Sequence, residues 1–159
     1  MPETKDKTIS ETMQSLRRIF KAIHDYSKDV SATFGVTGPQ LWALKTIAEE
    51  GTLPLGQLSR KMYLHPSTIS GVIDRLEDKG YVARVRDNDR GDRRVINVEL
   101  TLKGKRLIGK APNPIQGQMI FGLRKLKKEE LNLIYQSVRK LVKIMEAEDL
   151  KVTFFYDQE

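Results

Sequence analysis

The sequence predicts a mainly α-helical protein with a small β-hairpin. Three observations support this fold class. Apolar residues recur every three or four positions over long stretches near both ends of the chain, which is the pattern of amphipathic helices. Between residues 81 and 100, two short runs alternate apolar and polar residues, which is the pattern of strands. The polar segment RDNDRGDRR lies between these runs and predicts the loop of a hairpin.

Composition narrows the possible classes of protein. The chain has 159 residues, of which 39% are hydrophobic, so it can bury the core of one domain with helical extensions. It contains no cysteine, which excludes disulfides, thiolate nucleophiles and cysteine-ligated zinc. The two histidines, His24 and His65, are 41 positions apart, so we expect neither a metal ion nor a cofactor. No apolar run approaches a membrane span and no signal-peptide region is present, so we expect no membrane partner and a cytoplasmic location.

The positive charge is concentrated in one part of the sequence. The formal net charge is +7, and the segment from Pro54 to Lys110 holds 13 Lys and Arg against 7 Asp and Glu. The rest of the chain holds 15 against 14 and is nearly neutral. Such a concentration favours a polyanionic partner, because basic side chains release counterions when they neutralise phosphates. Ordinary solvated surface charge is the alternative.

The N-terminal segment, from about Thr8 to Ala32, predicts a long amphipathic helix. Its wide apolar stripe cannot remain stable alone and must pack on the rest of the chain or on a second subunit. The stripe comprises Ile9, Met13, Leu16, Ile19, Phe20, Ile23 and Val30.

A second helix is predicted from about Gly38 to Glu49. Thr37 is a suitable N-cap, Pro39 suits the first turn, and Gly51 suits a left-handed position after the helix. Trp42 is expected in the core, where its indole N–H would need a hydrogen-bond partner.

A shorter helix begins at Pro54 and is followed by a turn and a fourth helix. The short helix turns Leu55, Leu58 and Met62 inward. His65 is the expected N-cap of the fourth helix and Pro66 its first residue. In that helix, one face is apolar through Ile69, Val72, Ile73 and Leu76, and the opposite face carries Ser67, Thr68, Ser70, Gly71, Asp74 and Arg75.

The outward face of this fourth helix begins with small polar side chains. A helix that enters the major groove of DNA reads base edges with its first turns, where bulky side chains would hold it away. Hydroxyl groups donate to or accept from bases and phosphates, and the helix N-terminus favours a phosphate. The alternative is that these serines and threonines only cap the helix and face solvent.

The hairpin is predicted from Tyr81 to Val85 and from Val95 to Leu100. Its loop region is rich in arginine, and arginines at such a tip can enter the narrow minor groove of DNA. A solvated hairpin with weak internal ion pairs is the alternative. The arginines are Arg86, Arg90, Arg93 and Arg94.

The C-terminal part predicts three helical segments. Thr101 caps the first, and Pro112 and Pro114 should break it, giving segments of about 102–110 and 115–126. The last helix carries an apolar stripe that needs a partner, formed by Leu131, Ile134, Val138, Leu141, Val142 and Met145. The tail adds Phe154, Phe155 and Tyr156, which either dock on a dimer or form an exposed patch.

From Thr37 to about Leu150, the segments QLWAL, STISGVIDRLEDKGYV, DNDRGDRR and LTLKG resemble the MarR family of winged helix-turn-helix regulators. The resemblance implies a homodimer whose first and last helices interleave. It also implies that two recognition helices enter successive major grooves of a pseudo-palindromic operator, and that the hairpins, or wings, reach the flanking minor grooves. The expected division is 1–36 for an N-terminal dimerisation helix, 37–101 for the DNA-binding domain, and 102–159 for C-terminal dimerisation helices and tail.

The resemblance also assigns roles to individual residues. Ser67, Thr68 and Ser70 match groove-reading positions, Arg75 matches a backbone or base contact, and Asp92 with Arg94 matches a braced wing arginine. Gly71 departs from the family pattern, since many members carry a longer polar or basic residue there. A small aromatic or amphipathic effector is expected between the dimerisation helices and the DNA-binding lobe. Its candidate contacts are Arg17, Phe20, His24 and Trp42, and the favoured alternative is that all four are core or dimer contacts.

Three functional classes were weighed. The sequence favours a homodimeric regulator that binds specific double-stranded DNA, acts as a repressor and responds to a small ligand. The alternative is a winged-helix module that binds RNA or a protein partner without ligand control. An enzyme is not expected, because the chain has no Ser/His/Asp constellation and no phosphate-binding glycine loop.

Overall fold

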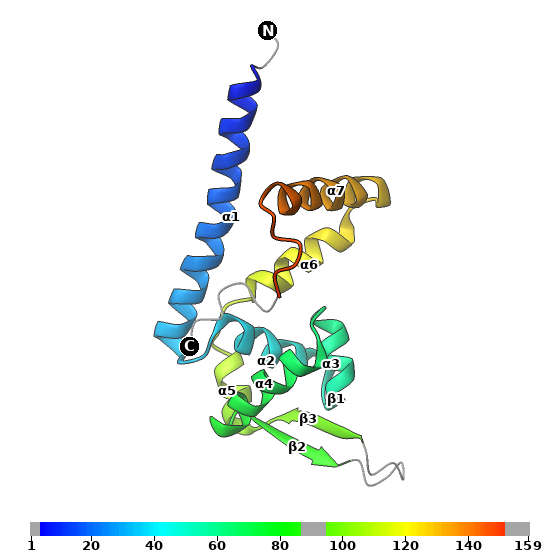
Figure 1. Cartoon of the computed structure of the whole chain (residues 1–159). Coiled ribbons are helices and arrows are strands. Elements are labelled where there is room, and N and C mark those ends of the chain that lie inside the picture. The colour runs from blue at the N-terminus through cyan, green and yellow to red at the C-terminus, as the bar shows by residue number, and fades with distance from the viewer. Residues whose placement is uncertain (1–3, 87–94, 152–159) are drawn as a thin grey trace.

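The computed structural model describes residues 4–86 and 95–151 (Figure 1). The fold is mainly helical with a small antiparallel sheet, as the sequence predicts. The elements are α1 (Lys5–Phe34), α2 (Gly38–Glu50), β1 (Leu53–Pro54), α3 (Leu55–Lys61), α4 (Pro66–Asp78), β2 (Val82–Arg86), β3 (Ile96–Leu100), α5 (Leu102–Ile108), α6 (Ile115–Lys125) and α7 (Lys128–Ile144).

One hydrophobic core holds α2, α3, α4, the sheet and α5 together as a lobe. All four residues of the predicted inner face of α4 are buried, which leaves its opposite face for solvent or a partner. Trp42 is only 8% exposed and belongs to this core, as predicted. The core residues of α4 are Ile69, Val72, Ile73 and Leu76.

The sheet has three strands in the order β1-β3-β2, one more than the predicted hairpin. In the hairpin, Val82 lies opposite Leu100 and Arg86 opposite Ile96. The additional strand pairs Leu53 with Val98, and both side chains are buried. Two residues are too few to show alternation, and proline is unfavourable inside a sheet, so no local pattern predicts β1.

Local hydrogen bonds explain where the helices begin. The Thr37 hydroxyl accepts from the backbone N–H of Gln40 at 3.3 Å, and the Gln40 side-chain oxygen accepts from the Thr37 N–H at 3.1 Å. This reciprocal pair is a capping box that satisfies two free donors at the start of α2. The Thr101 hydroxyl accepts from the Gly104 N–H at 3.2 Å and caps α5 in the same way.

The predicted break between the two C-terminal helical segments is confirmed. α5 ends at Ile108 and α6 begins at Ile115, with Pro112 between them. Lys45 of α2 stabilises this connection, since its ammonium donates to the carbonyl oxygens of Ile108 at 2.8 Å and Ala111 at 3.1 Å.

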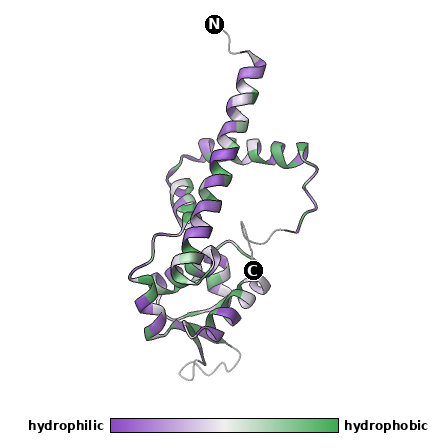
Figure 2. Ribbon diagram, turned by 90° about the vertical axis from the view of Figure 1, so that its left-hand side faces the viewer, coloured by the Kyte–Doolittle hydropathy of each residue, from purple (hydrophilic) through white to green (hydrophobic). Residues whose placement is uncertain are grey.

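Two helices extend beyond the lobe and expose apolar side chains. Figures 1 and 2 show α1 projecting from the lobe and α7 standing apart from α2–α5, with hydrophobic residues along α7. α7 buries no residue within the described chain. No helix in residues 4–86 and 95–151 is long and apolar enough to cross a membrane. Exposed apolar residues include Ile9, Met13, Ile19 and Phe20 on α1, and Leu131, Ile134 and Val138 on α7; the predicted tail cluster of Phe154, Phe155 and Tyr156 lies outside the described residues.

Candidate nucleic-acid interface

His65 caps the start of α4 through its ring. The backbone N–H of Ser67 donates to His65 Nδ1 at 3.2 Å, and the Ser67 hydroxyl lies 2.7 Å from the same nitrogen. The Nδ1 atom therefore acts as the acceptor that caps the first turn of α4. Pro66 then occupies the first helical position, where a missing N–H costs nothing. The predicted cap is therefore confirmed, and it orients Ser67 at the beginning of the outward face.

The outward face of α4 is small, polar and accessible near its N-terminus. Ser67 and Arg75 are exposed, whereas Thr68 and Ser70 are half-buried. Gly71 continues this face, and a Cβ added to it would meet nothing within 4 Å. The structure thus brings four of the predicted contact residues to one side of one helix.

Arg84 connects the hairpin to α4 and was missed by the sequence reasoning. Its guanidinium forms ion pairs with Asp74 and Glu77, and its backbone N–H donates to Glu77 Oε1 at 3.2 Å. Burial disfavours the charged guanidinium, but the hydrogen bonds to the two carboxylates outweigh burial and raise the pKa of Arg84. Strand alternation places Arg84 on the same face as the buried Val82, which is the signal that could have identified it.

Of the remaining candidate DNA contacts, only Arg86 is among the described residues. Arg86 is exposed at the end of β2. Arg90, Arg93 and Arg94, together with the proposed bracing residue Asp92, lie outside the described residues.

A hollow of about 400 Å³ lies between the start of α3, the outward face of α4 and the two strands of the hairpin. Ser70 of α4 and Arg84 of β2 both line it. Its other walls are formed by Pro54, Leu55, Gly56, Val95 and Ile96. The hollow therefore lies beside Ser70 on the outward face of α4, which carries candidate DNA contacts.

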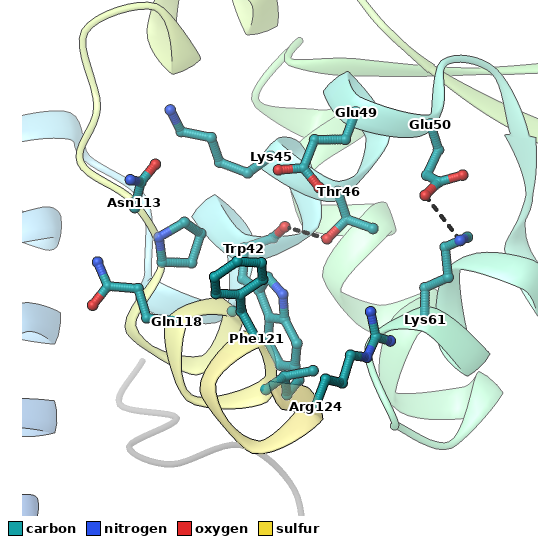
Figure 3. Close-up of a pocket in the computed structure, with 13 residues that line it drawn as sticks. Trp42, Lys45, Thr46, Glu49, Glu50, Lys61, Asn113, Gln118, Phe121 and Arg124 are labelled. Carbon is teal, nitrogen blue, oxygen red and sulfur yellow. Dashed lines mark hydrogen bonds and ion pairs between the residues drawn. The ribbon is translucent and has the colours of Figure 1, made fainter. Parts of the chain in front are cut away.

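A second concavity, the α2–α6 cleft, has a volume of about 350 Å³ (Figure 3). Trp42 contributes from α2, and Phe121 and Arg124 contribute from α6. Of the four predicted effector contacts, only Trp42 lines this cleft; Arg17, Phe20 and His24 are exposed on α1 and are not among its lining residues. The rest of the lining comprises Lys45, Thr46, Glu49, Glu50, Lys61, Asn113, Pro114, Gly117, Gln118 and Ile120.

Charges in the α2–α6 cleft are of both signs. Lys61 pairs with Glu50 at 2.8 Å, as the dashed line in Figure 3 shows. The Lys45 ammonium donates to two backbone carbonyl oxygens, and Glu49 also lines the cleft. Within the described part of the chain, no group of three or more His, Asp or Glu side chains could hold a metal ion.

Arg124 also connects the α2–α6 cleft to the turn before α4. Its Nη2 donates to the Tyr63 hydroxyl at 3.1 Å, and its guanidinium carbon lies 5.7 Å from the centre of the Tyr63 ring. Tyr63 follows α3 with a φ of 55°, a left-handed conformation that is uncommon for tyrosine. Arg124 therefore joins α6 to the turn that precedes α4.

The fold and these surfaces agree with what the chain is similar to. The MarR family model matches residues 36–96. The chain is 31% identical over 133 residues to the uncharacterized HTH-type transcriptional regulator YsmB of Bacillus subtilis, covering 84% of this chain and 90% of that protein. It is 32% identical over 99 residues to the HTH-type transcriptional repressor MdtR of Bacillus subtilis, covering 62% of this chain and 63% of that protein.

A solved structure gives the same result. The crystal structure of a MepR-like protein complexed with pseudoligands aligns with a TM-score of 0.57 and 32% identity, covering 85% of this chain and 94% of that chain. One family assignment follows from three findings. These are the helix-turn-helix of α3 and α4, the hairpin beside it, and the length over which the relatives match. The chain belongs to the MarR family of transcriptional regulators.

Proposed function

We propose that this protein is a homodimeric transcriptional regulator that binds specific double-stranded DNA, represses transcription and responds to a small ligand. The observation that carries the proposal is the outward face of α4, which is small and polar, lies beside the hairpin, and belongs to the basic part of the chain. Charge attracts the duplex in a salt-dependent way, and contacts to base edges select its sequence.

In this proposal, α4 enters the major groove and the hairpin reaches the neighbouring minor groove. Ser67, Thr68 and Ser70 contact base edges or phosphates, and Arg75 contacts the backbone or a base. Arg86 and the loop arginines Arg90, Arg93 and Arg94 supply positive charge to the narrow groove.

The dimer is proposed from the apolar side chains that α1 and α7 leave exposed. A helix such as α7, which buries no residue in the described chain, gains stability only by covering its stripe. We assign 1–36 and 102–159 to dimerisation and 37–101 to DNA binding. Two copies of α4 related by two-fold symmetry would then match a pseudo-palindromic operator.

Ligand control is proposed for the α2–α6 cleft. Trp42 and Phe121 offer aromatic surface, while Arg124 and Lys45 offer positive charge, so a small aromatic or amphipathic molecule suits this lining. A ligand acts only through its different affinity for two arrangements of the protein. The contact between Arg124 and Tyr63 offers a route by which cleft occupancy alters the position of α4. Repression is supported by the similarity to MdtR, which is named as a repressor.

A salt titration tests the proposal. It measures binding to random duplex DNA and to duplex RNA of the same sequence. We expect tighter binding to DNA, because the deep, narrow major groove of A-form RNA does not admit a helix. Affinity for DNA should fall linearly with salt on logarithmic axes. Equal or tighter binding to RNA would overturn the proposal in favour of an RNA-binding module.

A further inference from the structure

Gly71 lies in the interior of α4, where neither the backbone conformation nor the packing of the chain requires a glycine. It does not appear among the glycines with a positive φ, and an added Cβ would meet nothing within 4 Å. Gly104 of α5 is different, because its Cβ would lie 2.2 Å from the carbonyl oxygen of Tyr81. Gly80 is also explained, since its φ of 77° follows the end of α4. The fold therefore requires glycine at 80 and 104 but not at 71.

A glycine inside a helix destabilises it relative to alanine, because glycine loses more backbone entropy on folding. At position 71 no packing contact in the described chain compensates for that loss. Gly71 follows Ser70 directly and lies one helical turn after Ser67, so it belongs to the accessible outward face. Since the fold does not explain the glycine, we look to a partner that approaches the outward face of α4.

The neighbouring side chains indicate how close that approach must be. The hydroxyls of Ser67 and Ser70 extend only one bond beyond Cβ, so they reach base edges only when the helix lies deep in the groove. A longer side chain at position 71 would meet the base pairs first and hold both hydroxyls away from them. The small residues at 67, 70 and 71 thus form one continuous surface that allows α4 to lie close to the base pairs.

We propose that Gly71 is the point of closest approach between α4 and the base pairs, and that its missing side chain allows Ser67 and Ser70 to read the operator. This inference rests on the proposed function, since it assumes that α4 enters the major groove. Gly71 acts by seating the helix and makes no hydrogen bond through a side chain. Its contribution is therefore to specificity, because non-specific binding depends on phosphate contacts and does not require a seated helix.

Gly71→Ala tests the proposal, with Gly122→Ala as the matched control. Gly122 lies inside α6, and its added Cβ would also meet nothing within 4 Å. Both variants should raise the melting temperature, because alanine favours the helix. Binding is measured to a duplex that the wild-type protein selects from a random pool, and to a scrambled duplex of equal length.

We expect Gly71→Ala to weaken binding to the selected duplex by at least about fivefold, which corresponds to about 1 kcal/mol and the loss of one base contact. Binding to the scrambled duplex should be unchanged. Because Gly122 lies in the segment that we assign to dimerisation, the dimer content of each protein is measured as well, and Gly122→Ala should keep the wild-type ratio between the two affinities. Gly71→Leu should weaken specific binding further, since its side chain is longer.

Three results would each overturn the inference. Gly71→Ala could bind the selected duplex as tightly as the wild type, lose affinity equally for both duplexes, or have a lower melting temperature. A wild-type protein that does not distinguish the duplexes would overturn the proposed function as well. That outcome is recognisable because it occurs before any substitution is made.

Discussion

Replacing Arg84 by methionine should loosen the attachment of the hairpin to α4. The Arg84 guanidinium pairs with Asp74 and Glu77, and the exposed fractions of the three side chains are 24%, 60% and 39%. The pair with Glu77 is the more enclosed one, and Glu77 also accepts from the Arg84 backbone N–H. Methionine keeps most of the aliphatic packing but leaves the two carboxylates without their shared cation.

The size of the effect follows from this exposure. Exposed ion pairs contribute about 0.2–1 kcal/mol each, and the partial burial of Arg84 favours the upper part of that range. Two pairs together predict that Arg84→Met lowers the free energy of unfolding by about 1–2 kcal/mol. A double-mutant cycle with Glu77→Gln should give a coupling energy of about 0.5–1 kcal/mol, which decreases at high salt.

Urea denaturation of the wild type, both single variants and the double variant measures this coupling. All four proteins are compared at one concentration, because association shifts apparent stability. The exposed pair between Lys21 and Asp25 on α1, at 2.7 Å, is the control and should show weaker coupling. A coupling between Arg84 and Glu77 below about 0.3 kcal/mol would refute the reasoning that this pair attaches the hairpin to α4.

Three further predictions concern Arg94 of the predicted wing, Arg124 beside the turn before α4, and Tyr26 of α1. Arg94→Ala should weaken operator binding by at least about 1 kcal/mol while leaving the dimer intact, and unchanged affinity in a binding titration would contradict the assignment of the wing. Arg124→Gln should lower operator affinity by about 0.5–1 kcal/mol, since it frees the turn at Tyr63. Arg139→Gln removes the same kind of tyrosine contact within α7 alone, so equal losses in both variants would count against this role for Arg124. Burial raises the pKa of Tyr26 from 10.0 to about 12, so the folded protein keeps the phenol neutral where the unfolded chain ionises it. Stability should therefore be lost as pH rises from 10 towards 12. Tyr26→Phe should flatten this decline in melting temperature, and an unchanged decline would contradict the cause.

Features that depend on neighbouring residues were predictable from the sequence. Thr37, His65 and Thr101 were identified as caps from residue type and position, and each accepts the expected backbone N–H. The break before α6 followed from Pro112 and Pro114, because proline lacks the N–H that a helix interior needs. The inner face of α4 followed from its spacing of apolar residues.

Features that depend on contacts between distant residues were not predictable. β1 exists only because Leu53 pairs with Val98, 45 positions later in the chain. The contact between Arg124 and Tyr63 also joins residues far apart in sequence, and no local pattern indicates it. Periodicity shows which face of a helix is apolar but not which helix covers that face.

The effector site illustrates the same limit. Arg17, Phe20 and His24 were proposed from their positions near the apolar stripe of the N-terminal helix, and the structure places them on exposed parts of α1. The cleft that we propose for a ligand lies between α2 and α6, and of the four expected contacts Trp42 is the one that lines it. The position of α6 depends on the connection that Lys45 stabilises, which only the folded chain reveals.

The central claim is that two copies of this chain read specific DNA through α4. Selection of bound duplexes from a random pool, followed by sequencing, tests it most directly. We expect a pseudo-palindrome whose half-sites are about 10 base pairs apart, because two-fold-related helices enter successive major grooves. Recovery of no common sequence, or of a single half-site without a symmetric partner, would contradict it.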